Sequence, residues 1–247
     1  MNPLAQQRTF LTAEWKNLLM LNYAVEPQLL RPFVPAGTEL DTHDGITYAS
    51  LIGFEFNKTR LLGRPVPFHQ SFEEVNLRFY VRRGNRRGVV FIRELVPKVA
   101  VTAIARLAYG ENYSCVPMSH RIDNRSGELA VNYAWGSGPG RCTISATTTR
   151  EPYLPGQGSL SEFITEHYWG YAIRNGRTVE YQVDHPQWPV READAAEFSG
   201  DGARFYGSDF GRLLEQPSDS AFVAEGSAVT VFRGTPISQR QLNTPVN

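Results

Sequence analysis

The pattern of hydrophobic and polar positions along this chain of 247 residues is mainly that of β-strands. The clearest case is segment 75–81, in which apolar residues at the odd positions alternate with Asn76, Arg78 and Tyr80. Because successive side chains of a strand point to opposite faces, this alternation predicts a half-buried antiparallel strand. Further strands are predicted at 18–25, 46–56, 89–94, 129–135, 142–149, 172–174, 178–183 and 228–233.

Turn sequences join several of these strands into hairpins. Segment 82–88, with Gly84-Asn85 at its centre, links the strand at 75–81 to the strand at 89–94. Asn175-Gly176 is a strong hairpin signal, because both residues tolerate the positive φ of a type I′ turn. The four arginines of segment 82–88 also suggest a basic patch for nucleic acid, but a solvated turn is the simpler interpretation.

Helices are predicted to be few and short. The signals are Pro27 at the start of 26–33, an Ala-rich run at 99–109 before Gly110, a Ser159/Glu162 capping box opening a helix to about Tyr168, and a weaker start at 192–196 in the irregular region 191–220. Short hairpin-linked strands with few helices predict a mainly β fold, an antiparallel barrel-like sheet around a central cavity. With no linker or repeat, we expect one domain over residues 1–247.

Composition narrows the kinds of partner and compartment. The chain has 25 basic and 25 acidic residues and a formal net charge of zero, so we expect neither nucleic acid nor an anionic membrane surface as a partner. No apolar run approaches the roughly 20 residues of a membrane-spanning helix. The first 12 residues lack the charged start and apolar run of a secretion signal. These features predict a cytoplasmic protein. A small molecule is the expected ligand or substrate, and the oligomeric state stays open, with a homo-oligomer among the options.

Cysteine and histidine give no sign of a metal or another cofactor. Cys115 and Cys142 are too few for a disulfide framework and too distant for a C-x-x-C motif, so we expect both thiols to be reduced. The five histidines do not have the spacing of a metal site. We therefore expect no metal and no cofactor.

Lysine is scarce, which draws attention to the few that remain. The chain has three lysines, Lys16, Lys58 and Lys98, against 22 arginines. Only an amine can lose its proton when desolvated and act as a nucleophile. Lys98 lies between two apolar segments, 89–92 and 99–107. Two interpretations stay open: Lys98 ends a strand and points to water, or its amine points into a cavity.

Several motifs resemble a known family. The segment Trp15–Pro35, then Asp44-Gly45 and Glu74–Arg78, is similar to the opening of domain-of-unknown-function family 2071, also called YqjF-like. In the second half, the helix at 161–168 and the later H-P-x-W-P motif at 185–189 occur in the order typical of that family. The resemblance covers residues 13–235. This family in turn resembles acetoacetate decarboxylase, which implies a large, curved antiparallel barrel with a central cavity and a few outer helices.

The resemblance also implies a chemistry. In acetoacetate decarboxylase, a lysine that follows an R-E pair and a proline forms a Schiff base with a ketone. Arg93-Glu94 and Pro97-Lys98 match this motif if two residues are deleted between them. The departures are this deletion and Val99, which stands where the family has a second lysine beside the reactive one.

Two more positions match the decarboxylase pocket. Glu74 corresponds to a pocket glutamate, and Lys16 falls where the pocket has an arginine. The resemblance thus implies Lys98 and Glu74 as catalytic residues and Lys16 as a substrate-binding cation that could replace the missing lysine. For Glu74, an exposed carboxylate on an edge strand is the alternative.

Other residues are assigned to substrate binding on weaker grounds. Adjacent residues of a strand face opposite sides, so only one of Arg93 and Glu94 can enter the cavity, and we favour Arg93 inside and Glu94 outside. Trp188 and Tyr168 are expected to form walls of the cavity or the core. His185 is expected at the cavity, although a hydrogen-bonded structural role is the commoner fate of a single histidine.

Two functions from different classes follow. The first is an enzyme that acts on a small carbonyl or carboxylic compound through an imine at Lys98. The alternative is a non-catalytic protein that binds a small molecule in its cavity. A purely structural subunit of an oligomer is a third, weaker interpretation. Convergence of Glu74, Lys98 and Lys16 on one internal pocket would favour the enzyme.

Overall fold

The structure is a computed structural model that describes residues 8–99 and 112–238; most of the helix predicted at 99–109 lies outside these residues. The strands are β1 (Thr9–Val25), β2 (Glu39–Leu40), β3 (Thr47–Leu61), β4 (Arg64–Pro65), β5 (Phe72–Arg83), β6 (Arg86–Val96), β7 (Tyr113–Cys115), β8 (Met118–Arg125), β9 (Glu128–Trp135), β10 (Cys142–Thr148), β11 (Trp169–Arg174), β12 (Arg177–Asp184), β13 (Val190–Glu192), β14 (Ala195–Ser199), β15 (Ser220–Phe232) and β16 (Thr235–Pro236). The α-helices are α1 (Pro27–Leu30), α3 (Leu160–Thr165), α4 (Ala203–Tyr206) and α5 (Ser208–Leu214), and 3-10 turns occupy Arg31–Phe33 and Gly138–Gly140.

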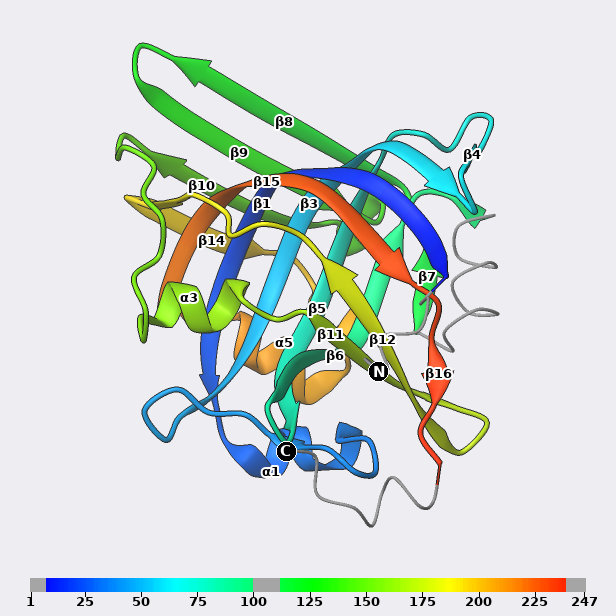
Figure 1. The fold of residues 1–247 in the computed structure, drawn as a ribbon. Helices are drawn as coiled ribbons and strands as arrows, with labels where there is room; N and C mark the ends of the chain where they lie inside the picture. The colour runs from blue at the N-terminus through cyan, green and yellow to red at the C-terminus, as the bar shows by residue number, and fades with distance from the viewer. Residues whose placement is uncertain (1–7, 100–111, 239–247) are drawn as a thin grey trace.

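The large sheet closes on itself. Its strands follow the order β15–β1–β3–β5–β6–β11–β12, and β12 pairs again with β15 (Figure 1). The predicted mainly β, barrel-like fold is therefore confirmed. One contact in the ring departs from the antiparallel expectation, because β6 and β11 pair in parallel at Trp169↔Gly88 and Gly170↔Val89. On the other side, the ring closes through Val183↔Val231 and Asp184↔Thr230.

A second, smaller sheet covers the outside of the barrel. It has the strand order β14–β10–β9–β8, and its apolar side chains pack with those on the outer face of β1, β3 and β5. Gly53 in the middle of β3 makes this approach possible. A Cβ atom at Gly53 would lie 2.7 Å from the Tyr133 ring and 2.9 Å from Ile144. The two layers thus meet where β3 has no side chain.

Both faces of the barrel wall are buried, which corrects the prediction for β5. Val75, Leu77 and Phe79 lie in the core beneath the small sheet, as the alternation indicates. The opposite face was expected to meet water, but Asn76 and Arg78 are only 2% and 9% exposed. Because the sheet is closed, the polar face of β5 looks into the barrel.

The local turn signals are confirmed. β5 and β6 form a hairpin around Gly84, and β11 and β12 form one around Asn175-Gly176, with φ of 50° and 71° at these two residues. The Ser159 hydroxyl accepts a hydrogen bond of 3.2 Å from the Glu162 amide at the start of α3, as a capping box requires.

The helix predicted at 192–196 is wrong. Its residues belong to the ends of two strands, since β13 pairs with β15 and β14 pairs with β10. Strand pairing with distant segments outweighs the weak local helix signal there. The helices of this region, α4 and α5, lie further along the chain.

Some classes of site are not seen in the part of the chain that is described. No helix within residues 8–99 and 112–238 is long and apolar enough to cross a membrane. Within the same ranges, no group of three or more His, Cys, Asp or Glu side chains is arranged to hold a metal ion. Cys115 is an exposed free thiol, and Cys142 is a buried one.

Candidate functional site: a polar cluster in an aromatic cavity

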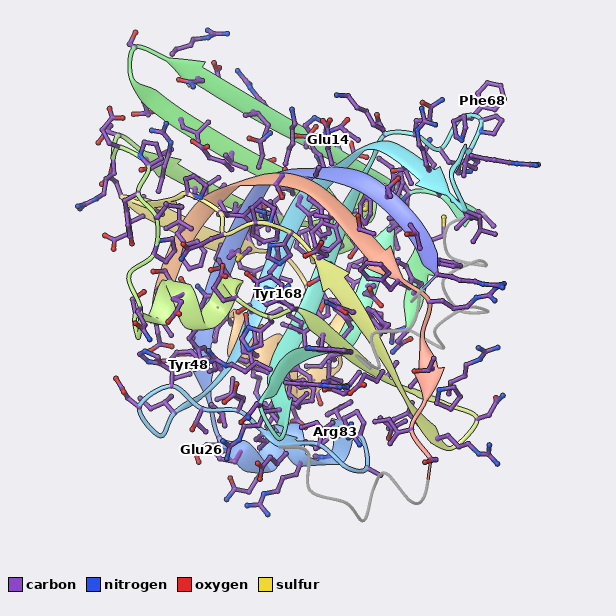
Figure 2. The ribbon with its side chains drawn as sticks, viewed as in Figure 1. Glu14, Glu26, Tyr48, Phe68, Arg83 and Tyr168 are labelled. Atoms are coloured by element: carbon purple, nitrogen blue, oxygen red, sulfur yellow. The ribbon has the colours of Figure 1, made fainter. Side chains whose placement is uncertain are left out.

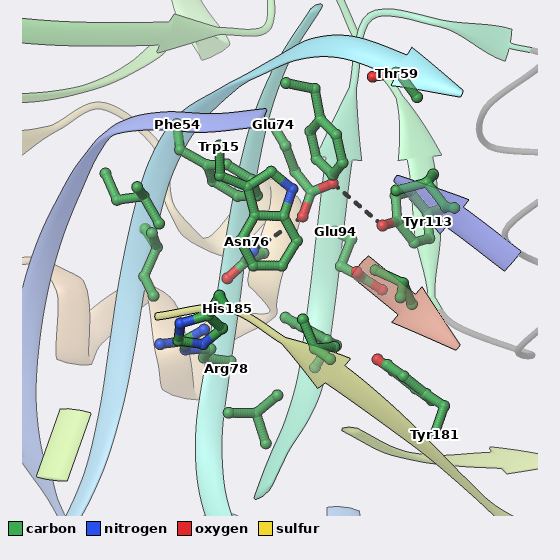
Figure 3. Close-up of a pocket in the computed structure, with 18 of the residues that line it drawn as sticks. Trp15, Phe54, Thr59, Glu74, Asn76, Arg78, Glu94, Tyr113, Tyr181 and His185 are labelled. Carbon is green, nitrogen blue, oxygen red and sulfur yellow. Dashed lines mark hydrogen bonds between the residues drawn. The ribbon is translucent and has the colours of Figure 1, made fainter. Parts of the chain in front are cut away.

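The interior of the barrel contains a cavity. All seven strands of the ring contribute lining residues, and many of these are aromatic, among them Trp15, Phe54, Phe72, Phe91 and Trp188 (Figure 3). The volume of the cavity is about 140 Å³. An engineered cavity of about 150 Å³ in another protein accommodates benzene, so the space suits a compound of similar size.

Glu74 is the central acidic group of the cavity. It lies on β5 and is 2% exposed. The Asn76 side-chain amide donates a hydrogen bond of 3.0 Å to Glu74 Oε1, and the Tyr113 hydroxyl donates one of 3.1 Å to Glu74 Oε2 (Figure 3). Burial raises the pKa of Glu74 to about 7, although the two hydrogen bonds and the charge of Arg78 oppose the rise. At neutral pH, this carboxyl is therefore poised to bind or release a proton.

Glu94 also faces the cavity, so the prediction that it points outward is wrong. It lies opposite Asn76 on β6, beside Tyr113 of β7, and is 2% exposed. Burial raises the pKa of Tyr113 well above its usual range, and the charges of Glu74 and Glu94 add to the rise. The Tyr113 hydroxyl therefore keeps its proton and acts as a donor.

Arg93 lies on the outer face, which corrects its assignment to the substrate site. Its guanidinium donates hydrogen bonds of 2.8 Å to Asn112 Oδ1 and 3.2 Å to Ser114 Oγ. The cause is a β-bulge: Leu77 pairs with Arg93, but Arg78 pairs with Phe91, so Ile92 is an extra residue. A bulge reverses the alternation of side chains along a strand. In a regular strand, Val89, Phe91 and Arg93 would all face the cavity. Because of the bulge, Glu94 faces the cavity in place of Arg93.

A second bulge turns Lys16 outward. The pairing of β1 with β3 shifts between Lys16 and Leu19, where Asn17 has a φ of 53°. Trp15 and Leu18 consequently both line the cavity. The Lys16 side chain is 54% exposed, and its ammonium lies 3.7 Å from Glu14 Oε2. The predicted convergence of Lys16 with Glu74 is therefore contradicted.

Lys98 stands just beyond the end of β6 and is half-buried. It is not among the described residues that line the cavity, whereas Glu94 of the same strand is. The structure thus brings Glu74 together with Glu94, Asn76 and Tyr113, and it places Lys16 outside this group.

The three remaining predicted residues form an aromatic stack. The His185 ring lies 4.0 Å from the Trp188 ring at an angle of 17° and 4.8 Å from the Tyr168 ring at 31°. His185 and Trp188 line the cavity, but Tyr168 does not. Trp188 Nε1 donates a hydrogen bond of 2.8 Å to Ser227 Oγ, and this bond holds the indole ring in its place in the cavity wall. Burial lowers the pKa of His185, so the ring is neutral near pH 7.

Arg78 and His167 are two further cavity residues that the sequence did not reveal. Arg78 was expected on the solvent-facing side of its strand, and no role was predicted for His167. Both line the cavity. Burial lowers the pKa of His167 to about 4, against the opposing effect of Asp41, so its ring is also neutral near pH 7. The signal that could have found Arg78 is its spacing of two residues from Asn76 and four from Glu74, which places all three on one face of the strand.

Comparison with known sequences places the chain in a family. The sequence pattern of domain-of-unknown-function family 2071, described as an uncharacterised conserved protein, matches residues 12–228. The chain belongs to this family. It is 26% identical to the uncharacterised protein YqjF of Bacillus subtilis over 191 residues, which cover 73% of this chain and 75% of that protein. The resemblance identified from the motifs is thereby confirmed.

Solved structures with the same fold include enzymes. The enduracididine biosynthesis enzyme MppR, complexed with pyruvate, has a TM-score of 0.69 at 16% identity over 96% of this chain and 93% of its own. Acetoacetate decarboxylase from Legionella pneumophila has a TM-score of 0.68 at 12% identity over 96% and 92%. An acetoacetate decarboxylase-like enzyme from Sphingomonas wittichii has a TM-score of 0.65 at 14% identity over 96% and 98%. At these identities the likeness shows the fold alone.

Proposed function

We propose that the chain binds a small carbonyl or carboxylic compound in the barrel cavity and that Glu74 exchanges a proton with it. The observation that carries this proposal is the burial of Glu74 among aromatic rings, with its pKa raised to about 7. A buried carboxyl is costly unless it is paired or hydrogen-bonded, so it is seldom kept without a purpose, and perturbed acids concentrate at functional sites.

Two polar atoms in the cavity wall suit such a ligand. Asn76 Oδ1 and Trp15 Nε1 are buried and have no hydrogen-bond partner among the described residues. Buried polar atoms in a folded protein are normally satisfied, so a ligand with both accepting and donating atoms suits them. The aromatic walls would remove its apolar part from water.

Glu74 can work in either direction near pH 7. As a carboxylate it would take a proton from the carbon next to a carbonyl group, and as a carboxylic acid it would return a proton to carbon or oxygen. Tyr113 and Asn76 would hold the carboxyl in place through their hydrogen bonds. No net proton is gained or lost over such an exchange.

A cavity-filling variant tests the proposed binding. Ile52 lines the cavity, so Ile52→Phe should reduce binding of small ketones, 3-oxo acids and aromatic acids, measured by calorimetry and by the fluorescence of Trp15 and Trp188. Ile173→Phe is the matched control, because Ile173 is 52% exposed outside the cavity. Circular dichroism checks that both variants fold. Binding that survives in Ile52→Phe, or that is absent from the wild type, contradicts the proposal.

Imine chemistry at Lys98 is a second, finer hypothesis. Its support is that Lys98 follows the strand that supplies Glu94 to the cavity. In such a step the neutral amine adds to a carbonyl carbon, water leaves and a C=N bond forms. Borohydride supplies hydride to this bond and makes the adduct permanent.

The imine hypothesis is tested separately from binding. Borohydride with a panel of ketones, aldehydes and 3-oxo acids should label Lys98, and Lys98→Arg should remove the label without loss of the fold. Lys58 is the internal control, since its side chain is 76% exposed. Equal labelling at both lysines, or no labelling at either, rejects the imine and leaves the cavity-binding function in place.

A further inference from the structure

Arg78 is a buried cation inside the barrel. It lies on β5 four residues after Glu74, with Asn76 between them on the same face of the strand. The side chain is anchored at one atom, since Arg78 Nη2 donates a hydrogen bond of 3.1 Å to the carbonyl oxygen of Ile164 in α3. Figure 3 shows Arg78 beside His185, on the side of Asn76 away from Tyr113. The guanidinium is therefore held at the opposite end of the polar cluster from Tyr113.

Arg78 lacks the ion pair that the other buried arginine of the barrel wall has. Arg83 (labelled in Figure 2), 7% exposed, lies 3.5 Å from Glu180 Oε2. Within residues 8–99 and 112–238, no ion pair joins Arg78 to a carboxylate, and its Nε has no hydrogen-bond partner. A buried charge without a partner is strongly unfavourable, so buried arginines are normally paired.

The groups that face Arg78 do not supply the missing charge. Glu74 and Arg78 interact electrostatically, but the Glu74 carboxyl makes its hydrogen bonds to Asn76 and Tyr113. His167 and His185 also lie within the electrostatic reach of Arg78, and both rings are neutral near pH 7. The guanidinium therefore has an open place for an anion.

We infer that Arg78 is the anion-binding residue of the cavity and that the ligand is a small carboxylate with an aromatic or apolar body. This inference rests on the proposed cavity-binding function and narrows its ligand class. The carboxylate accepts from the free Nε–H of Arg78, and the fixed fork of the guanidinium suits the geometry of a carboxylate. The body of the ligand lies between Trp188 and the phenylalanine rings. Arg78 thus takes the part that the sequence suggested for Lys16.

Benzoate and benzamide test the charge preference, because they have nearly the same shape and a size that suits the cavity. The wild type should bind benzoate at least about tenfold more tightly than benzamide at pH 6 and low salt, where Glu74 keeps its proton and does not repel the ligand, since charge-assisted hydrogen bonds are the stronger ones. Arg78→Met should bring benzoate down to the affinity of benzamide and leave benzamide unchanged. Calorimetry and tryptophan fluorescence report both affinities.

Arg82→Met is the matched control. Arg82 is on the same strand, but it is 51% exposed and pairs with Glu39 at 3.0 Å, so the preference for benzoate should persist. Equal affinity of the wild type for the two probes overturns the inference about Arg78 and leaves the proposed function intact. If neither probe binds but a ketone or 3-oxo acid of the earlier panel does, the inference is overturned and the proposed function stands; if no compound of the panel binds, both are overturned. The wild-type comparison decides the matter even if Arg78→Met does not fold.

Discussion

The Tyr113 hydroxyl donates a hydrogen bond of 3.1 Å to Glu74 Oε2 and joins β7 to β5 across the cavity. A donor that meets a carboxylate favours the charged form, so this bond partly offsets the effect of burial on Glu74. The protonation state of Glu74 near neutral pH thus depends on a residue from a different strand. It follows that the acidity of the site can be changed without changing the acid.

Removing this donor should make Glu74 a weaker acid. In Tyr113→Phe we expect the pKa of Glu74 to rise further above 7, as measured by the pH titration of its side-chain carboxyl carbon in NMR spectra. Tyr153→Phe is the matched control, because Tyr153 donates an equivalent bond of 3.1 Å to Glu192, far along the chain from Glu74. An unchanged or lower pKa in Tyr113→Phe contradicts the geometry.

The raised pKa of Glu74 predicts how stability depends on pH. Between pH 4.5 and about 7 the folded state holds the proton more tightly than the unfolded state does, so this group lowers the unfolding free energy as pH rises through that window. Glu74→Gln removes the effect. Relative to wild type, the variant should gain about 3 kcal/mol between pH 4 and pH 8, at about 1.4 kcal/mol for each pKa unit.

Chemical denaturation at a series of pH values measures this difference. Glu225→Gln is the control, because Glu225 is exposed on β15 and its carboxylate meets water in both states. A difference between Glu74→Gln and wild type that stays flat from pH 4 to pH 8 rules out a raised pKa at Glu74.

The contact between the two sheets predicts a sensitive glycine. Gly53→Ala should destabilise the fold by about 1–3 kcal/mol, because the added carbon falls 2.7 Å from the Tyr133 ring and forces the layers apart. Gly156→Ala adds the same carbon where no atom lies within 4 Å. That variant should be neutral or stabilised by up to about 1 kcal/mol. Equal thermal denaturation midpoints for the two variants would argue against the packing.

The two thiols should react at very different rates. Burial raises the pKa of Cys142 to about 11, whereas Cys115 is exposed. A disulfide reagent at pH 8 should therefore modify one thiol quickly in the folded protein, and the second only after denaturation. Cys115→Ser should abolish the fast phase, and Cys142→Ser should leave it. Two fast thiols in the wild type would show that Cys142 is reachable.

The sequence predicted the local part of the fold well. Asn175-Gly176, Gly84-Asn85 and the Ser159 cap act through neighbouring residues, and each forms the expected turn or helix end. The apolar face of β5 also lies in the core, as its alternation indicates. Each of these features is determined within a few residues of chain.

The site depended on information that is not local. Whether Asn76 and Arg78 face water or a cavity is decided by closure of the barrel, which a single strand does not reveal. The outward positions of Lys16 and Arg93 come from bulges, and a bulge is defined only by pairing with another strand. The family resemblance predicted that Glu74 lies in the cavity, and it does. No motif could reveal where a bulge reverses the alternation of side chains along a strand.

The β11–β12 hairpin is joined to β6 and to β15 through two residue pairs each, and to the short strand β16 through two more, whereas β1 and β3 pair along nearly their whole length. Local opening therefore costs the least free energy at this hairpin, and its edge amides should exchange with solvent deuterium before those of β1. Trp169, Tyr181 and Val183 of the hairpin line the cavity. The barrel wall is therefore least extensively paired beside the cavity, and we expect a ligand to enter and leave through local opening of this hairpin.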